Sequence, residues 1–388
     1  MKAIIVGAGI GGPVLALWLQ KLGFEVVLTE ARPSLSVEGA WLGLAPNGLN
    51  ALEPLGLASR IGAVGHACSR FQFENRSGKN IGEIDRSADR SAFGHPLTMV
   101  RRADLHEALA AACEERGLRT AFNRKLTKIE NHSTYVVAHF EDGTSERGDF
   151  LVGCDGMRSA TRALALPESP APKFAGLLDF GGFTRISNST LPTGVNVMVF
   201  GAKAFFGAFC PPNGNGETWW FHNGPPSDAE LTIEQHRARM LELHAEDPQW
   251  IRDVIASTPQ VLGPWKIHDL VAMPRWSSGR VCLLGDAAHA MSPSAGQGAS
   301  MAMEDALVLA QCLRDLKDPA AAFTTFEKLR RPRVDAIFKA AQRQSNNKAL
   351  SPIGAWFRDR LLSYFLRLGS KAQSESYAFR VNFEERVA

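Results

Sequence analysis

The chain has 388 residues, 45% of them hydrophobic, and its 43 basic and 40 acidic side chains give a formal net charge of only +3. This length and apolar content suffice for a large core and predict two domains, while the balanced charge gives no electrostatic reason to expect a nucleic-acid partner. The six cysteines are scattered, without C-x-x-C or paired spacing, so reduced thiols in a cytoplasmic protein are expected. No stretch approaches the roughly eighteen apolar residues of a membrane span.

The N-terminal segment has the pattern of a dinucleotide-binding unit. An apolar strand precedes Gly7, Gly9 and Gly12, which form G-x-G-x-x-G. Leucines at helical spacing then lead to a second strand at residues 25–29, which runs into Glu30. Such glycines permit a tight turn and a close approach of pyrophosphate, and an acid about twenty residues later can bind ribose hydroxyls. The segment therefore predicts a nucleotide site.

A second anion-binding pattern lies at residues 280–304, which read as strand, acidic turn, glycine-rich loop and helix start. The strand ends at Gly285 and Asp286, and backbone amides at the start of the following helix can bind an anion. A flavin nucleotide offers hydroxyls for Asp286 and a developing negative charge for the loop. The loop contains Pro293, Gly296, Gln297 and Gly298.

A third segment, residues 150–162, is an apolar strand that runs into Asp155 and Gly156, with Ser159 and Arg162 at the start of an expected helix. A strand followed by Asp-Gly also occurs in ordinary turns. This segment taken alone leaves both interpretations open.

In this order and spacing, the three segments resemble the FAD-dependent aromatic hydroxylases, the class A flavoprotein monooxygenases related to p-hydroxybenzoate hydroxylase. The family's D-G-x-x-S-x-x-R pattern is matched at residues 155–162, and the likeness covers about residues 1–340. Its G-D-A-x-H and P-x-x-G-Q-G patterns are matched at Gly285, Asp286, Ala287, His289, Pro293, Gly296, Gln297 and Gly298.

The resemblance implies an α/β fold: a Rossmann-like FAD-binding domain, an inserted and mostly antiparallel β-sheet substrate domain, and a C-terminal helix. We place the first segment of the FAD-binding domain at residues 1–172, with a strand pair near 70–98 that projects to the substrate domain. The substrate domain spans 173–270, the second FAD-binding segment 271–345, and the C-terminal helical region 346–388.

The C-terminal region carries apolar residues at helical spacing, among them Phe357, Leu361 and Tyr364, with Arg358 and Arg360 between them. A basic amphipathic helix can lie on a membrane surface. Most such stripes face protein, so we expect this helix to pack across the two domains, without stable membrane association.

The resemblance also implies the cofactor contacts. Glu30 should hold the adenosine ribose, Arg102 the phosphate or ribityl region, and Asp286 the ribityl chain. The family often has Arg directly after the acid, whereas Ala31 here precedes Arg32, and Gly43 stands where a hydroxyl-bearing residue is common. Further contacts are expected at Gly7, Gly9, Gly11, Gly12, Ala31, Arg32, Gly43, Leu126, Asp155 and Ala299. The expected catalytic element is the backbone loop of Pro293, Gly296, Gln297 and Gly298.

The implied reaction is a monooxygenation that consumes NADPH or NADH. A flavin C4a-hydroperoxide would deliver one oxygen atom from O2, and the protein would bind the flavin, exclude water and place the substrate. No catalytic triad is evident and no metal-ligand spacing is present, so no metal is expected.

Two rival functions share parts of this pattern. A flavin halogenase would carry a W-x-W-x-I-P segment, but Trp219 and Trp220 are followed by Phe221 and His222. A flavoprotein dehydrogenase or reductase that never forms the hydroperoxide remains the alternative. His289 is expected to form a structural hydrogen bond rather than act as a base.

The substrate side predicts an apolar, aromatic-walled pocket. None of the three tyrosines lies in the middle sheet, so a paired-tyrosine device for deprotonating a phenol is missing. Urate-type relatives place an arginine and a tyrosine on strands that here read KAFFGAF and TWWFHN, which disfavours small anionic substrates. Strand alternation sends half of these aromatics to the core. The expected substrate contacts are Arg185, Phe206, Phe209, Trp219, Phe221 and His222.

The expected substrate is consequently a large, apolar aromatic, phenolic or polycyclic molecule, and a tetracycline-like one is possible. The other partners are O2 and NADPH or NADH. We expect a monomer or a homodimer with no nucleic-acid partner.

Overall fold

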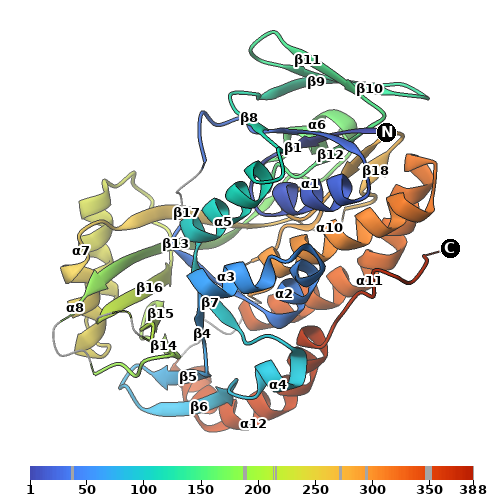
Figure 1. Cartoon of the computed structure of the whole chain (residues 1–388). Helices are drawn as coiled ribbons and strands as arrows, with labels where there is room; N and C mark the ends of the chain where they lie inside the picture. The colour runs from blue at the N-terminus through green and yellow to red at the C-terminus, as the bar shows by residue number, and fades with distance from the viewer. Residues whose placement is uncertain are drawn as a thin grey trace.

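Two large β-sheets organise the molecule (Figure 1). The computed structural model describes residues 1–35, 39–186, 190–212, 214, 216–270, 273–292, 296–345 and 352–387. Within these residues the strands form a six-stranded, a seven-stranded and two three-stranded sheets. Parallel and antiparallel sheets thus combine with helices, and the predicted α/β fold class is confirmed.

The six-stranded sheet has the strand order β18-β19-β12-β1-β2-β8, and its strands are parallel except at the β18 edge. Residues 3–6 of β1 are all buried, as expected of a parallel strand covered on both faces. The strands are β1 Lys2–Val6, β2 Glu25–Thr29, β8 Thr120–Ala121, β12 Phe150–Gly153, β18 Ser277–Ser278 and β19 Val281–Leu283.

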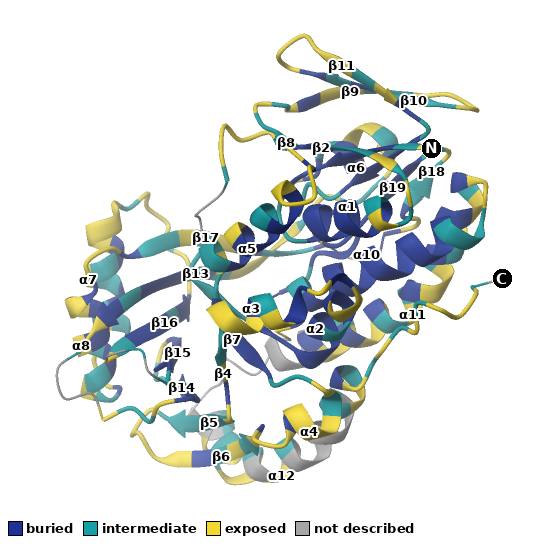
Figure 2. Cartoon of the chain, in the orientation of Figure 1, coloured by how far each residue is buried: buried dark blue, intermediate teal, exposed yellow. Residues whose placement is uncertain are grey.

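Helices α1 (Gly11–Lys21) and α10 (Gly298–Asp315) pack together beside this sheet and form much of the main core. Both are largely buried, as Figure 2 shows. α5 (Arg102–Glu114) and α11 (Pro319–Ser345) pack against α1 and α10, respectively. The starts of α1 and α10 are helix ends that the sequence linked to a cofactor, and Arg102, another implied contact, is the first residue of α5.

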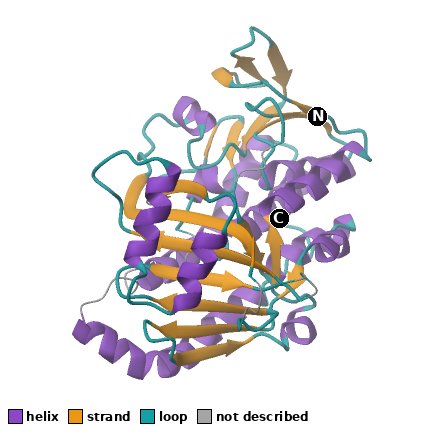
Figure 3. Ribbon diagram, turned by 90° about the vertical axis from the view of Figure 1, so that its left-hand side faces the viewer, coloured by secondary structure: helices purple, strands orange, loops and turns teal. Residues whose placement is uncertain are grey.

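The seven-stranded sheet has the order β17-β13-β16-β15-β14-β5-β6, with one parallel pair, β14 and β5. Helices α7 (Ile233–Leu243) and α8 (Gln249–Ser257) lie across one of its faces (Figure 3). The strands are β5 Arg70–Asn75, β6 Asn80–Asp85, β13 Lys173–Arg185, β14 Val195–Phe200, β15 Phe205–Phe209, β16 Glu217–Gly224 and β17 Leu262–Asp269.

β5 and β6 come from the first hundred residues, yet they form one edge of the seven-stranded sheet. The chain therefore contributes to this sheet before it completes the six-stranded one. The domain boundaries given above remain predictions.

A three-stranded sheet of β3 (Trp41–Leu44), β7 (Thr98–Arg101) and β4 (His66–Ala67) lies against the seven-stranded sheet. A second one, which contains β9 (Leu126–Asn131), β10 (Val136–Phe140) and β11 (Ser145–Gly148), packs beside β1 and β12. The short helices are α2 Pro46–Leu52, η1 Glu53–Leu55, α3 Ala58–Val64, α4 Asp89–Phe93, α6 Ala160–Ala165 and α9 Asp286–His289.

The C-terminal helix α12 (Pro352–Tyr377) packs beside β6 and α2 (Figure 1), and Leu362 joins the aromatic cluster there. Three residues of the stripe predicted to pack across the domains are instead exposed: Phe357 is 53% exposed, Leu361 42% and Tyr364 60%. A different face of the helix therefore makes the contact. None of the described helices is long and apolar enough to cross a membrane.

Candidate flavin and substrate site

The glycine turn after β1 is built for a close approach. Gly7 has φ +103°, and a Cβ there would lie 2.5 Å from the Cys154 carbonyl oxygen. A Cβ at Gly12 would lie 1.9 Å from the Gly7 carbonyl oxygen, and one at Gly11 2.7 Å from Leu284 Cδ2. A Cβ at Gly9 would meet nothing within 4 Å. Gly7 and Gly12 are thus required by neighbouring backbone atoms, while Gly9 faces the open space that a pyrophosphate needs.

Glu30 closes the same turn from the end of β2. Its carboxylate accepts hydrogen bonds from Ala8 N at 2.9 Å and from Arg32 N at 3.0 Å. A carboxylate has further lone pairs, so ribose hydroxyls can still bind to it. Ala31 is exposed. A pocket beside Glu30 is lined by Ala8, Gly9, Glu30, Arg32, Leu35, His106 and Phe122.

Residues 123 and 124 lie beside Glu30 and precede Leu126, which the resemblance implied as a cofactor contact. Asn123 N donates to Arg32 O at 2.9 Å, and Arg124 N donates to Glu30 O at 2.8 Å. Leu126 lies farther along, and its buried side chain packs with Ile4 in the core. Only the backbone of Leu126 can therefore reach a cofactor. Phe122, which lines the pocket, carried no motif signal.

Asp286 stands at the turn between β19 and α9. Gly285 before it has φ +61° and ψ −136°, a conformation suited to glycine. The Asp286 side chain is exposed although protein surrounds it. This surrounding raises the pKa of Asp286 by desolvation, against the opposing effects of His289 and Arg102.

The start of α10 faces Asp286, because a Cβ at Gly298 would lie 3.9 Å from Asp286 Oδ1. Gly296 has φ +60°, and Gln297 is buried and accepts a hydrogen bond from Asn47 Nδ2 at 3.0 Å. Ala299 lies in the first turn of α10. Pro293 of the predicted loop lies outside the described residues. The hydroxyl-binding acid and the amide-rich helix start are therefore neighbours.

We call the turn at residues 7–12, Glu30, Asp286 and the start of α10 the cofactor corner. A buried charge network stabilises the part of it beside Asp286. Arg330 contacts Glu304 Oε2 and Asp305 Oδ1, each at 2.7 Å, and Arg333 contacts Glu304 Oε1 at 2.7 Å. His289 Nε2 lies 2.6 Å from Asp305 Oδ2, which agrees with a structural hydrogen bond. Burial favours a higher pKa for Asp305, but His289 and Arg330 outweigh it and lower the pKa to about 2.

Asp155 is occupied by hydrogen bonds within the protein. Ser159 Oγ donates to its Oδ1, and Thr161 N and Oγ1 both donate to its Oδ2 at 2.9 Å. Arg162 reaches across to the Ala287 carbonyl oxygen at 2.8 Å. The Asp-Gly segment thus caps α6 and ties it to α9, and a cofactor contact of Asp155 stays a prediction.

Arg102 is the first residue of α5 and is exposed. Its stem fills the space beside Gly39, where a Cβ would lie 2.5 Å from Arg102 Cδ. Its charge acts on Asp286, so the two predicted cofactor contacts are near each other. At Gly43 a Cβ would lie 3.3 Å from Met99 Sδ, which leaves the backbone of Gly43 as its possible cofactor contact.

The seven-stranded sheet turns one aromatic face toward the FAD-binding segments. Trp41 of β3 lies 6.2 Å from Phe209, 6.2 Å from Trp219 and 5.7 Å from Phe221, measured between ring centroids. Phe209 and Trp219 are fully enclosed, whereas Trp41 and Phe221 are half-buried. Three of the predicted substrate contacts thus share one face, and Trp41 joins them from a segment that the motifs did not single out.

Phe206 and His222 lie on the opposite face, so the expectation that they line a pocket above the flavin is wrong. Phe206 stacks on Trp220 at 5.6 Å in the core beneath α7 and α8. His222 Nδ1 lies 2.9 Å from His244 Nε2, and His244 Nδ1 lies 2.6 Å from Asp247 Oδ2. Residues alternate along a strand, and the helices cover this half of them.

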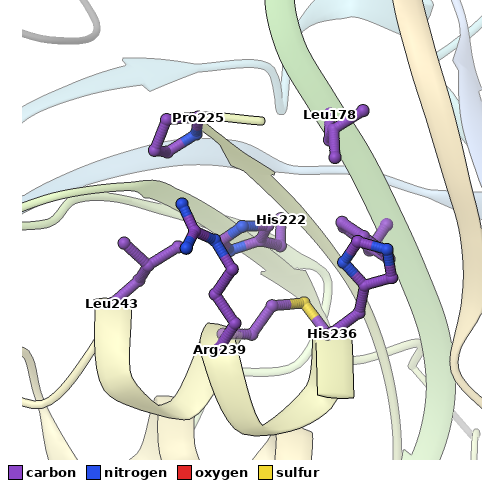
Figure 4. Close-up of a pocket in the computed structure, with 8 residues that line it drawn as sticks. Leu178, His222, Pro225, His236, Arg239 and Leu243 are labelled. Atoms are coloured by element: carbon purple, nitrogen blue, oxygen red, sulfur yellow. The ribbon is translucent and has the colours of Figure 1, made fainter. Parts of the chain in front are cut away.

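His222 does line a hollow, but one between the sheet and α7 (Figure 4). His236 and Arg239 of α7 enter it from the helix, and Leu178 enters it from β13. Since it lies on the helix-covered face, this hollow is separate from the cofactor corner.

The predicted polar contact, Arg185, lies opposite Glu217 in the ladder of β13 and β16, and a second arginine reaches the same face. Arg185 ends β13 and is exposed. Arg101 of β7 lies over the Phe183 ring at 4.5 Å and over the Trp219 ring at 5.5 Å, and is paired with Glu217. Sequence reasoning had no signal for this pair, because it joins strands from different sheets.

Tyr377 was also missed. It is buried in the same cluster as Phe209 and Trp219, although it comes from the end of α12. Burial raises the pKa of its hydroxyl to about 12. A search for tyrosines confined to the middle sheet could not find it.

Residues 1–341 match the family described as "FAD binding domain". Over 360 residues the chain is 29% identical to aurachin C monooxygenase/isomerase of Stigmatella aurantiaca, covering 92% of this chain and 90% of that protein. Over 365 residues it is 30% identical to the FAD-dependent urate hydroxylase of Klebsiella pneumoniae subsp. pneumoniae, covering 92% and 94%. The crystal structure of Klebsiella pneumoniae HpxO complexed with FAD and uric acid superimposes with a TM-score of 0.89 at 26% identity, covering 97% and 96%.

The chain therefore belongs to the FAD-binding-domain family, and it matches FAD-dependent monooxygenases of that family over nearly their whole length. The predictions of FAD as the cofactor and of a monooxygenase activity are confirmed at this level.

Proposed function

We propose that this protein consumes NADPH or NADH and inserts one oxygen atom from O2 into a large, apolar aromatic, phenolic or polycyclic molecule. The proposed substrate class is based on the aromatic face formed by Trp41, Phe209, Trp219 and Phe221. The names of the relatives, which include a urate hydroxylase, support oxidation of an aromatic ring.

The residues of the cofactor corner suit FAD. Gly9 leaves room for the pyrophosphate, Glu30 offers its carboxylate to the ribose, and Asp286 offers its carboxylate to the ribityl hydroxyls. The amides at the start of α10, from Gly298 onward, would offset negative charge on the ring system. When bound, FAD supplies the activation of O2.

The aromatic face would hold the substrate and keep water out. Ring faces favour offset or edge contacts with another aromatic ring, and a half-buried pair such as Trp41 and Phe221 can still make them. Exclusion of water from the reacting atoms protects a reactive oxidant from decay. A planar, apolar substrate fits this environment better than a small, highly charged one.

The test is a turnover assay with purified holoprotein. NADPH and NADH oxidation and O2 uptake are followed across a panel of phenols, quinolones, anthraquinones and tetracyclines. We expect one group of compounds to stimulate both and to gain one oxygen atom by mass. Substrate-dependent flavin reduction without oxygen insertion would favour a dehydrogenase or reductase instead.

A further inference from the structure

Three cations that touch aromatic clusters are each paired with a carboxylate. Arg101 is paired with Glu217, Arg86 lies 3.6 Å from Asp89, and Arg358 lies 2.8 Å from Asp359. Their guanidinium groups lie over the rings of Phe183, Tyr377 and Phe200, respectively, which belong to two aromatic clusters. The positive charge of each of these arginines is therefore offset by a neighbouring carboxylate.

Of these three arginines, Arg101 is the one that a ligand can reach. Its side chain is 34% exposed, compared with 3% for Arg86 and 10% for Arg358. It lies on β7 opposite Trp41 in the ladder, directly before Arg102 at the start of α5. An accessible arginine between the two sheets would bind an aryl carboxylate strongly if no carboxylate of the protein were paired with it.

Glu217 is placed to mask it. One carboxylate oxygen contacts Arg101, and the other accepts a hydrogen bond from Trp219 Nε1 at 2.7 Å. Glu217 therefore offsets the guanidinium and orients the indole at the same time. His66 adds no charge at neutral pH, because burial lowers its pKa despite the nearby carboxylate.

We propose that Glu217 determines specificity: by pairing with Arg101 it offsets the charge of this guanidinium at the pocket wall, so that uncharged aromatic substrates bind and aryl carboxylates do not. This inference rests on the proposed function for the location of the substrate, and it narrows the substrate class to molecules uncharged at this end. An anion would have to displace Glu217 and leave a partly buried carboxylate unpaired, which is costly.

The test is a binding experiment on the FAD-loaded protein with a matched pair of probes, 3-hydroxybenzamide and 3-hydroxybenzoate. Glu217→Gln keeps an oxygen that can accept from Trp219 Nε1 but removes the charge that masks Arg101. We expect the wild type to prefer the amide, and Glu217→Gln to bind the carboxylate at least about tenfold more tightly than the wild type does.

Two further variants make the result specific. Glu83→Gln removes a carboxylate that pairs with Arg70 on another strand of the same sheet, and it should leave the preference unchanged. Adding Arg101→Gln to Glu217→Gln should abolish the gain in carboxylate binding. A Glu217→Gln protein that holds FAD but gains no carboxylate affinity would overturn the inference, as would a wild type that prefers the carboxylate. Because binding needs no turnover, failure of the proposed oxygenation would show separately in the O2-uptake assay.

Discussion

Arg330 is the residue on which the buried charge network depends. It is 1% exposed and contacts both Glu304 and Asp305. Arg330→Met would leave the Asp305 carboxylate with His289 and that of Glu304 with Arg333. Loss of one partner of a buried ion pair typically costs about 3–5 kcal/mol, so we expect the free energy of unfolding to fall by about that amount in urea titrations.

The matched control for this change is Arg119→Met at an exposed position. It should alter the unfolding free energy by less than about 0.5 kcal/mol. An equally small effect of Arg330→Met would mean that the network contributes no stability.

Asp286 tests the cofactor corner at the level of one side chain. Its carboxylate faces the start of α10, and the residue is exposed. Hydrogen bonds to a charged group contribute about 1.5–3 kcal/mol, so Asp286→Ala should weaken FAD binding at least tenfold. The bound flavin of the purified protein, read from its absorbance, measures this. Full occupancy would contradict the assignment, and Asp142→Ala in an exposed turn should keep its flavin.

The elements that could be predicted from sequence are those with local signals. The second strand was expected at residues 25–29 and is observed there as β2, because a run of valines between a glycine turn and Glu30 marks both ends. The face that each aromatic of β15 and β16 occupies could not be predicted. Alternation separates Trp219 from Trp220, but the docking of α7 and α8 on one face decides which of them lies beneath the helices.

Substitutions of the two tryptophans of β16 should therefore differ in their effect on substrate binding. Trp220 is packed with Phe206 beneath the helices and donates from Nε1 to Thr258 Oγ1 at 2.8 Å. Trp220→Ala should lower the free energy of unfolding by about 3–5 kcal/mol. Trp219→Ala removes an equally enclosed ring, and it should in addition weaken substrate binding about tenfold with the flavin retained. If Trp220→Ala lost substrate affinity at full stability, the assignment of the two faces would be reversed.

The histidine pair beneath α7 predicts a pH dependence of stability. Burial and the neighbouring His244 hold the pKa of His222 well below its ordinary value. Below about pH 6.5 the unfolded chain takes up a proton here that the folded protein does not. The contribution of His222 is therefore complete above that pH and is lost as the pH falls.

Urea unfolding of the wild type and of His222→Gln between pH 8 and pH 5 measures this contribution. The wild type should lose more stability on acidification than the variant, whereas His132→Gln at an exposed position should follow the wild type. Parallel curves for the wild type and His222→Gln would show that the histidine titrates normally in the folded protein.

On the scale of the whole molecule, the cofactor corner was predictable and the substrate wall was not. Gly7, Glu30 and Asp286 each sit in a short motif whose backbone geometry is local. Arg101 and Glu217 meet only after two sheets dock, and Tyr377 arrives from the last helix. Contacts of this kind depend on tertiary packing and leave no short-range pattern in the sequence.

The measurement that tests the central claim most directly is isotope incorporation. The holoprotein is supplied with NADPH or NADH, a stimulating aromatic compound and 18O2 in ordinary water, and the product is analysed by mass spectrometry. We predict that the product carries one 18O atom and that the second oxygen atom is reduced to water. A product without the label would contradict the account of this protein as an FAD-dependent monooxygenase.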